Sequence, residues 1–186
     1  MKIGNKQIGF QICALLILIN SSVTMAQPLK DKTLTESGFK DWMKTRIETH
    51  KLQLEFKANA GQYDDLPLAY FSARNEWLES EGKDPDEWDQ YSEWIHAIYS
   101  SLEEKRDIEE EKSRFKAEIE EIDNNEFLNA EQKQMMKSGL TQVLDKREEM
   151  LEPYKDDWPV AEKYESTFIE LMDWTTGNVP NPPEID

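Results

Sequence analysis

The chain of 186 residues carries 39 acidic and 22 basic side chains, which gives a formal net charge of −17. A chain of this length can bury a core as one domain. Nucleic acid and anionic membrane surfaces would repel it, because contacts to phosphate need lysine and arginine. The charge therefore excludes these partners. It leaves two readings: a surface that attracts basic peptides or cations, and one that only keeps the protein soluble.

The first 26 residues are typical of a secretory signal peptide. Lys2 and Lys6 make its start positive. Residues 12–19 form an apolar run that is shorter than the roughly 20 residues a membrane-spanning helix needs. Thr24 and Ala26 satisfy the small-residue rule for cleavage. We therefore predict cleavage after Ala26 and export of the mature chain.

The only cysteine, Cys13, lies inside that apolar run. Cleavage would leave the mature chain without a disulfide, a thiol nucleophile or a cysteine-ligated metal. Secreted eukaryotic domains of this size more often carry paired cysteines. The sequence thus predicts a periplasmic or fully secreted protein of bacterial origin.

The mature chain is predicted to be all-α, because no stretch shows the strict alternation of apolar and polar residues that marks a strand. It divides into a flexible lead at 27–33, a single helical domain at 34–177 and a proline-rich tail at 178–186. We expect about five helices in an irregular bundle from which one long helix partly projects.

The first two helices precede the long one. The first covers residues 35–57 and carries Phe39 and Trp42 on its apolar face. The second begins at Pro67 and ends near Gly82, because proline suits the start of a helix and glycine its end.

Residues 84–122 are predicted to form one long helix, or two nearly continuous ones. Asp84 can cap its start, and Pro85 suits the first helical position. No glycine or further proline interrupts it, so the helix would be roughly 55 Å long. Its charged second half should therefore project, or be covered by one partner helix only. Apolar residues recur at helical spacing through the first half, at Trp88, Tyr91, Ile95, Ile98 and Leu102.

Two more helices complete the prediction. Asn129 and Gln132 have the spacing of a capping box, and the helix that they open stops before Pro153. A fifth helix should run from a cap at Asp157 to Gly177.

Residues 128–132 read Leu-Asn-Ala-Glu-Gln. This stretch is similar to the Leu-Thr-x-x-Gln motif of the Spy/CpxP-like periplasmic helical proteins. Asn129 replaces the threonine, the second copy of the motif is missing, and the match covers only this stretch. The resemblance implies an all-α, stress-linked chaperone or modulator of the cell envelope.

Glu93 and His96 are the candidate metal ligands, since a Glu-x-x-His spacing occurs in di-metal helical bundles. Those bundles use two such pairs, whereas the other histidine, His50, follows Ile47 at that spacing. No zinc-protease, phosphate-loop or hydrolase-elbow motif occurs. We therefore predict no catalytic residue, cofactor or resident metal. An enzyme or metal binder using Glu93 and His96 stays as an alternative.

Four residues are candidates for binding a partner. Trp88 and Trp94 lie on different sides of the long helix, so we expect one of them to face outward. Apolar residues return at helical spacing in the charged half, as a stripe flanked by carboxylates that suits a basic amphipathic segment. Packing of this stripe against the fourth helix is the other reading. The candidates are Trp94, Phe115, Ile119 and Ile122.

These features favour a non-catalytic interaction or chaperone-like module of the cell envelope, with a protein or peptide as its partner. A small metal-binding protein or enzyme is one alternative. An envelope-stress or inhibitor-type protein that works through its negative surface is another. The oligomeric state stays open.

Overall fold

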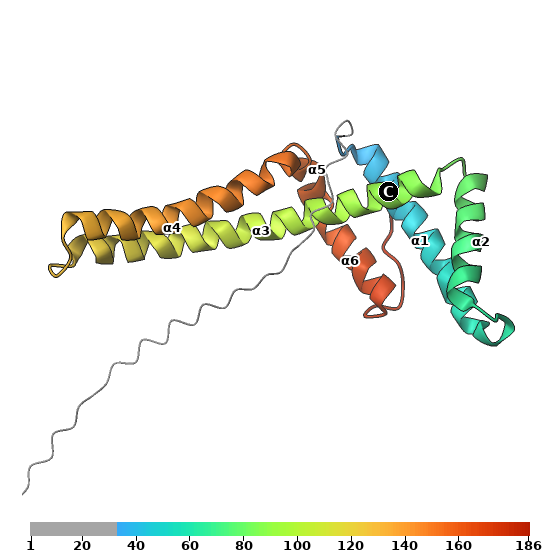
Figure 1. The fold of residues 1–186 in the computed structure, drawn as a ribbon. Coiled ribbons are helices and arrows are strands. Elements are labelled where there is room, and N and C mark those ends of the chain that lie inside the picture. The colour runs from blue at the N-terminus through green and yellow to red at the C-terminus, as the bar shows by residue number, and fades with distance from the viewer. Residues whose placement is uncertain (1–32) are drawn as a thin grey trace, which may run out of the picture.

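The computed structural model describes residues 33–186, and this part of the chain contains six α-helices and no β-strand (Figure 1). The all-α prediction is confirmed. The predicted signal peptide and its cleavage site lie outside the described residues. The helices are α1 (Glu36–Ala58), α2 (Leu66–Ser80), α3 (Pro85–Asn124), α4 (Ala130–Leu151), α5 (Trp158–Lys163) and α6 (Glu165–Thr176), with 3₁₀ turns at Ala60–Gln62 and Glu152–Tyr154.

Side-chain caps stabilise the starts of four helices, α1 to α4, and the caps of α3 and α4 are the predicted ones. The Asp84 carboxylate accepts from the Glu87 amide at 2.9 Å and caps α3. Asn129 and Gln132 form the reciprocal capping box at the start of α4, with distances of 2.9 and 3.0 Å. Gly177 follows α6 with a φ of +85°, a conformation that glycine adopts without the strain of a Cβ.

The predicted fifth helix is wrong in two respects. It is interrupted at Tyr164, so α5 and α6 are separate helices. The Tyr164 ring lies 5.8 Å from that of Phe39 and its hydroxyl donates to the Glu36 carboxylate, and these two contacts with α1 hold the bend. Asp157 precedes α5 but makes no side-chain cap. Its carboxylate accepts from the Leu34 amide instead.

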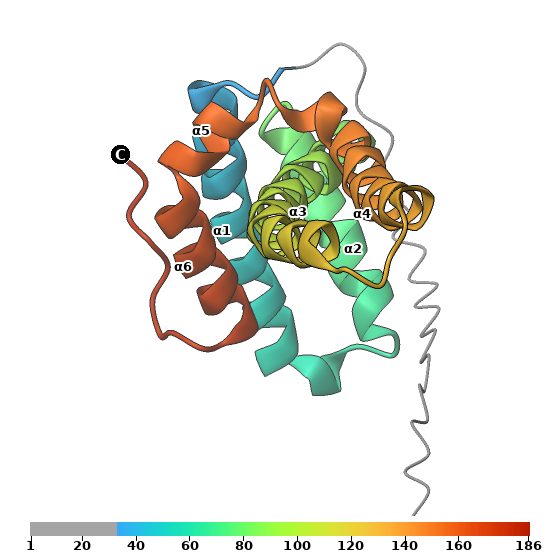
Figure 2. The same ribbon diagram turned by 90° about the vertical axis from the view of Figure 1, so that its left-hand side faces the viewer.

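The body of the molecule surrounds the first half of α3. Figure 2 looks along the long axis and shows α1, α2, α5 and α6 on different sides of it. The core is aromatic: the rings of Tyr99 and Phe168 stack with centroids 3.6 Å apart, and Trp42 stacks on Phe168 at 6.1 Å. Burial of such large side chains contributes about 1.5–3 kcal/mol each. The body therefore holds most of the stabilising apolar contact.

The second half of α3 continues beyond the body, and α4 returns beside it in the opposite direction (Figure 1). We call the part of α3 from Ile108 onward, together with α4, the arm. Its buried cluster has only three members, Ile108, Leu144 and Leu151. Arg147 of α4 adds ion pairs to Glu104, at 2.6 Å, and to Glu111 of α3. The predicted projection of the long helix is confirmed, with one helix covering it.

Candidate interaction surface on the projecting arm

An apolar groove lies between the two helices of the arm. Phe115 and Ile119 of α3 and Leu144 of α4 line it, and its volume is about 410 Å³. Leu144 is buried below the groove, while Phe115 and Ile119 are half-buried. The groove exists because the antiparallel helices bring the α3 stripe against α4 without covering it. It offers apolar surface to a ligand of helical or extended shape.

Charges of both signs border this groove. Lys112 and Lys116 lie on the α3 side, and Glu120 of α3 and Asp145 of α4 complete the rim. Lys112 also forms an exposed ion pair with Glu148 at 2.6 Å, a type of contact that contributes little to stability. The carboxylates expected beside the stripe are therefore present, and lysines lie beside them because the turns between the apolar residues of α3 carry both signs of charge.

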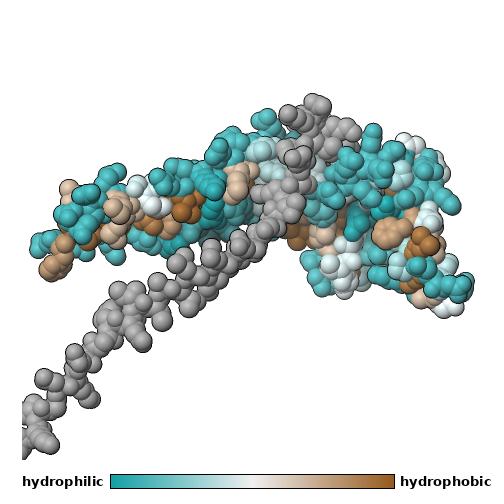
Figure 3. All heavy atoms as spheres, in the orientation of Figure 1, coloured by the Kyte–Doolittle hydropathy of each residue, from teal (hydrophilic) through white to brown (hydrophobic). Residues whose placement is uncertain are grey.

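A second apolar strip runs along the outside of α4. Met136, Val143 and Met150 follow one another at intervals of seven residues and are each about half exposed. Phe127, in the loop at the tip of the arm, is 96% exposed. Figure 3 shows hydrophobic side chains spread along the arm between hydrophilic ones. The arm thus presents apolar surface on more than one face.

The structure brings together only part of the predicted partner-binding set. Phe115 and Ile119 share the groove, and Ile122 lies one turn further, half-buried and outside the groove lining. Trp94 belongs to the body core, where it is 3% exposed and stacks on Tyr154 at 5.0 Å. Trp88 is buried as well, so the expectation that one of the two faces outward is wrong. The body surrounds this part of α3 on several sides, and helical spacing alone does not reveal that.

Glu93 and His96 do not gain further ligands from the fold. Glu93 is exposed, whereas the His96 ring packs edge-on against Trp42 at 5.9 Å and near Phe168 at 5.8 Å. Burial, with a smaller effect of Arg46, lowers the pKa of His96. Within residues 33–186, no group of three or more histidine, cysteine or acidic side chains is arranged to hold a metal ion.

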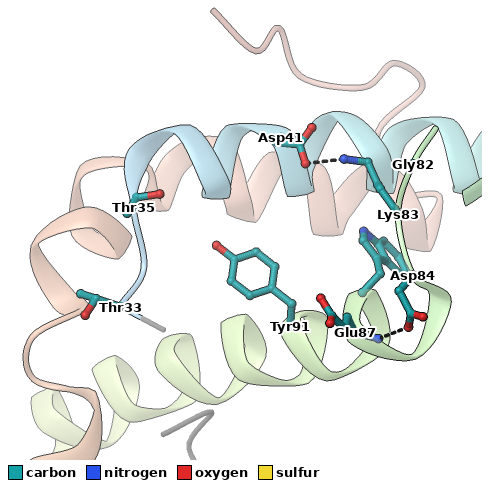
Figure 4. A pocket seen from close by; sticks show the side chains of 9 residues that line it. Thr33, Thr35, Asp41, Gly82, Lys83, Asp84, Glu87 and Tyr91 are labelled. Atoms are coloured by element: carbon teal, nitrogen blue, oxygen red, sulfur yellow. Dashed lines mark hydrogen bonds and ion pairs between the residues drawn. The ribbon is translucent and has the colours of Figure 1, made fainter. Parts of the chain in front are cut away.

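A hollow that the sequence did not indicate lies between the starts of α1 and α3 (Figure 4). Its volume is about 680 Å³. Asp41 pairs with Lys83, and Asp84 caps α3, so these polar groups already have roles within the fold. Figure 4 shows the Tyr91 ring on the α3 side of the hollow, reaching toward α1. The lining residues are Thr33, Thr35, Asp41, Gly82, Lys83, Asp84, Glu87, Trp88 and Tyr91.

The Tyr91 hydroxyl occupies space that a side chain at position 38 would need. A Cβ on Gly38 would lie 2.9 Å from the Tyr91 oxygen, which is too close for an ordinary contact. Burial, aided by Asp157 and Asp41, raises the pKa of Tyr91 to about 12. Gly38 therefore permits the close approach of α3 to α1, and we interpret the hollow as part of this junction.

Comparison with protein-family models, with curated proteins and with solved structures finds no match to this chain. Among the described residues, no helix combines the length and the apolar character needed to cross a membrane.

Proposed function

We propose that the mature chain is an exported, non-catalytic interaction protein of the bacterial cell envelope, and that its arm holds an amphipathic helical segment of a partner protein. The observation that carries this proposal is the groove of Phe115, Ile119 and Leu144, which is open on a structure that projects from the body. A chaperone-like role corresponds to transient capture of such segments.

A helix is the occupant that the groove suits best. Side chains of α3 and α4 form the two walls of the groove. The apolar residues of a partner helix, at positions i, i+3, i+4 and i+7, can pack between them.

The charge of the chain favours a basic partner. Acidic residues outnumber basic ones by 39 to 22, so a positively charged segment is attracted from a distance. The rim has both signs, so the bound segment should carry a few acidic residues opposite Lys112 and Lys116. Steering of this kind raises the association rate and weakens with salt, because the screening length is about 8 Å at physiological ionic strength.

Export is supported by the sequence. The charged start, the short apolar run and the cleavage pattern before residue 27 are the features of a secretory signal peptide. The single cysteine within that run is consistent with a mature chain that needs no disulfide.

The test is the affinity of the purified mature chain for a fluorescently labelled amphipathic peptide of leucine and lysine, with a few glutamates, measured by anisotropy. We expect Ile119→Ala to weaken binding by about tenfold, the effect of losing one buried anchor. Ile169→Ala is the matched control, because Ile169 is 52% exposed on α6, outside the arm. Absence of binding by the wild type, or equal binding by the wild type and Ile119→Ala, would overturn the proposal.

A further inference from the structure

Arg46 is the only arginine in the described residues that has no carboxylate partner. Its Nε is buried and donates to no acceptor. The other four arginines of the chain each pair with an acid, in a protein that has an excess of acids. These pairs are Arg74 with Asp89, Arg106 with Glu165, Arg114 with Glu111, and Arg147 with Glu104.

The position of Arg46 is a junction of three helices. Three residues after Arg46 on α1, the Thr49 carbonyl accepts a long hydrogen bond of 3.4 Å from the Tyr70 hydroxyl of α2. One turn before Arg46, the Trp42 indole donates to Ser92 of α3 at 2.7 Å. Arg46 therefore lies where α1, α2 and α3 meet, and its side chain is half-buried, so part of it is exposed to solvent although Nε is not.

The charged groups that act on Arg46 have both signs. Arg74 of α2 is close enough to lower the pKa of Arg46, although burial is the larger cause. Burial lowers the pKa of both histidines of the chain, His50 and His96, and the charge of Arg46 lowers it further. The nearby acid, Asp89, is held by Arg74 through two hydrogen bonds of 3.0 and 2.8 Å.

A partly buried guanidinium without a counter-charge is costly, because water no longer solvates it fully. An arginine keeps its charge in a protein, so it cannot relieve this cost by losing a proton. We propose that Arg46 is an anion site that binds a carboxylate from outside the chain, with the Tyr70 hydroxyl and Arg74 beside it. A carboxylate is the matching ligand, since its two oxygens fit the planar donor fork of a guanidinium.

The carboxylate has two sources with the same chemistry, a small organic acid or the free C-terminus of a peptide. The test follows the Nε–Hε signals of the five arginines in ¹H–¹⁵N spectra of the mature chain, at constant pH and ionic strength. Sodium chloride is replaced stepwise by sodium acetate in one series. A short peptide with a free C-terminus is added in a second series, and the same peptide with an amidated C-terminus in a third.

We expect a saturable shift of the Arg46 signal with acetate, with the free-ended peptide, or with both, and none with the amidated peptide. Whichever of the first two ligands binds at the lower concentration identifies the source. Inorganic phosphate should shift the Arg46 signal less than a carboxylate does at equal concentration. A signal that stays unmoved by both carboxylates, or that moves equally with the amidated peptide, would overturn the proposal.

Substitutions give a second measurement, the rise in thermal midpoint that the bound ligand causes. This rise should disappear in Arg46→Met and persist in Arg106→Met, because Arg106 is exposed and already paired with Glu165. If Arg46→Met does not fold, Arg46→Lys keeps the charge without the donor fork and should reduce the rise. A full rise in both Arg46 variants would contradict the site.

Discussion

The Asp157 carboxylate accepts a hydrogen bond of 2.6 Å from the backbone amide of Leu34, and this bond joins the start of the described chain to the residue that precedes α5. Asp157 is only 3% exposed. Burial raises its pKa, although the bond from Leu34 acts in the opposite direction. The bond therefore holds two segments that are distant in the sequence together, and it leaves a carboxylate buried away from water.

The pKa shift indicates what Asp157→Asn should do. A raised pKa means that the folded state binds the proton more tightly than the unfolded state, so stability decreases as pH rises from about 3.8 through the folded pKa. Asparagine is neutral and can still accept from the Leu34 amide. At pH 7 we expect Asp157→Asn to melt no lower than the wild type, and Asp157→Ala to lose about 1–3 kcal/mol by leaving that amide unpaired. Equal losses in both variants would show that the negative charge itself is needed.

The contact between Gly38 and Tyr91 leads to a double-mutant prediction. Gly38→Ala should destabilise the protein, because the new Cβ meets the Tyr91 oxygen at 2.9 Å. Combined with Tyr91→Phe, which removes that oxygen, the same change should cost less, since alanine is favoured over glycine inside a helix by about 1 kcal/mol. Chemical denaturation of the four proteins gives the coupling energy. A cost of Gly38→Ala that is independent of residue 91 would contradict this interpretation.

The structural features that depend on neighbouring residues could be predicted from the sequence. Those that depend on contacts between distant residues could not. The starts of α3 and α4 follow from capping residues within one turn, such as Asp84 and Asn129. The role of Asp157 depends on an amide 123 residues earlier, and no local pattern carries that information. The bend at Tyr164 likewise depends on contacts with Glu36 and Phe39.

The candidate site shows the same division. The spacing of Phe115 and Ile119 indicated an apolar stripe on α3, and both residues do line the groove. Leu144 forms the opposite wall of the groove. Its position depends on the register of α4 against α3, which could not be predicted from the sequence. Trp94 was misplaced because the body encloses its helix on several sides. Arg46 belongs to no sequence motif, and it stands out only because its Nε has no hydrogen-bond acceptor in the structure.

Mild acid should weaken the fold through its two histidines. Burial is the main cause that lowers the pKa of His50 and of His96, with Arg46 adding to it and Lys57 also acting on His50. The unfolded chain then binds more protons below about pH 6.5, so the free energy of unfolding falls as pH decreases from there. The slope is at most about 1.4 kcal/mol per pH unit for each histidine.

Denaturant unfolding at pH 6.5 and at pH 5.5 measures this loss. Most carboxylates stay ionised in this range, so they contribute little to it. The double variant His50→Gln with His96→Phe should show a smaller loss between the two pH values than the wild type, whatever its absolute stability. An unchanged loss would assign the pH dependence to other groups.

The arm should unfold before the body when its small core is weakened. Leu144→Ala removes one of three buried apolar side chains, a change that typically costs about 2–5 kcal/mol. Five of the six tryptophans lie in α1, α2, the first half of α3 and α6, and only Trp158 of α5 packs against the buried cluster of the arm. Helical circular dichroism should therefore decrease at a lower temperature than tryptophan fluorescence changes. Leu171→Ala, in the body core, should shift both transitions together. Coincident transitions in Leu144→Ala would show that arm and body unfold as one unit.

The most direct test of the proposed interaction is to observe the isoleucine methyl groups during titration with the basic amphipathic peptide. Ile119 lies in the groove, whereas Ile169 is exposed on α6 and serves as a control within the same molecule. We expect the Ile119 methyl signals to shift saturably, those of Ile122 to follow more weakly, and those of Ile169 to stay in place. Shifts at Ile169 without shifts at Ile119, or no shifts at a peptide concentration well above that of the protein, would contradict binding in the groove of the arm.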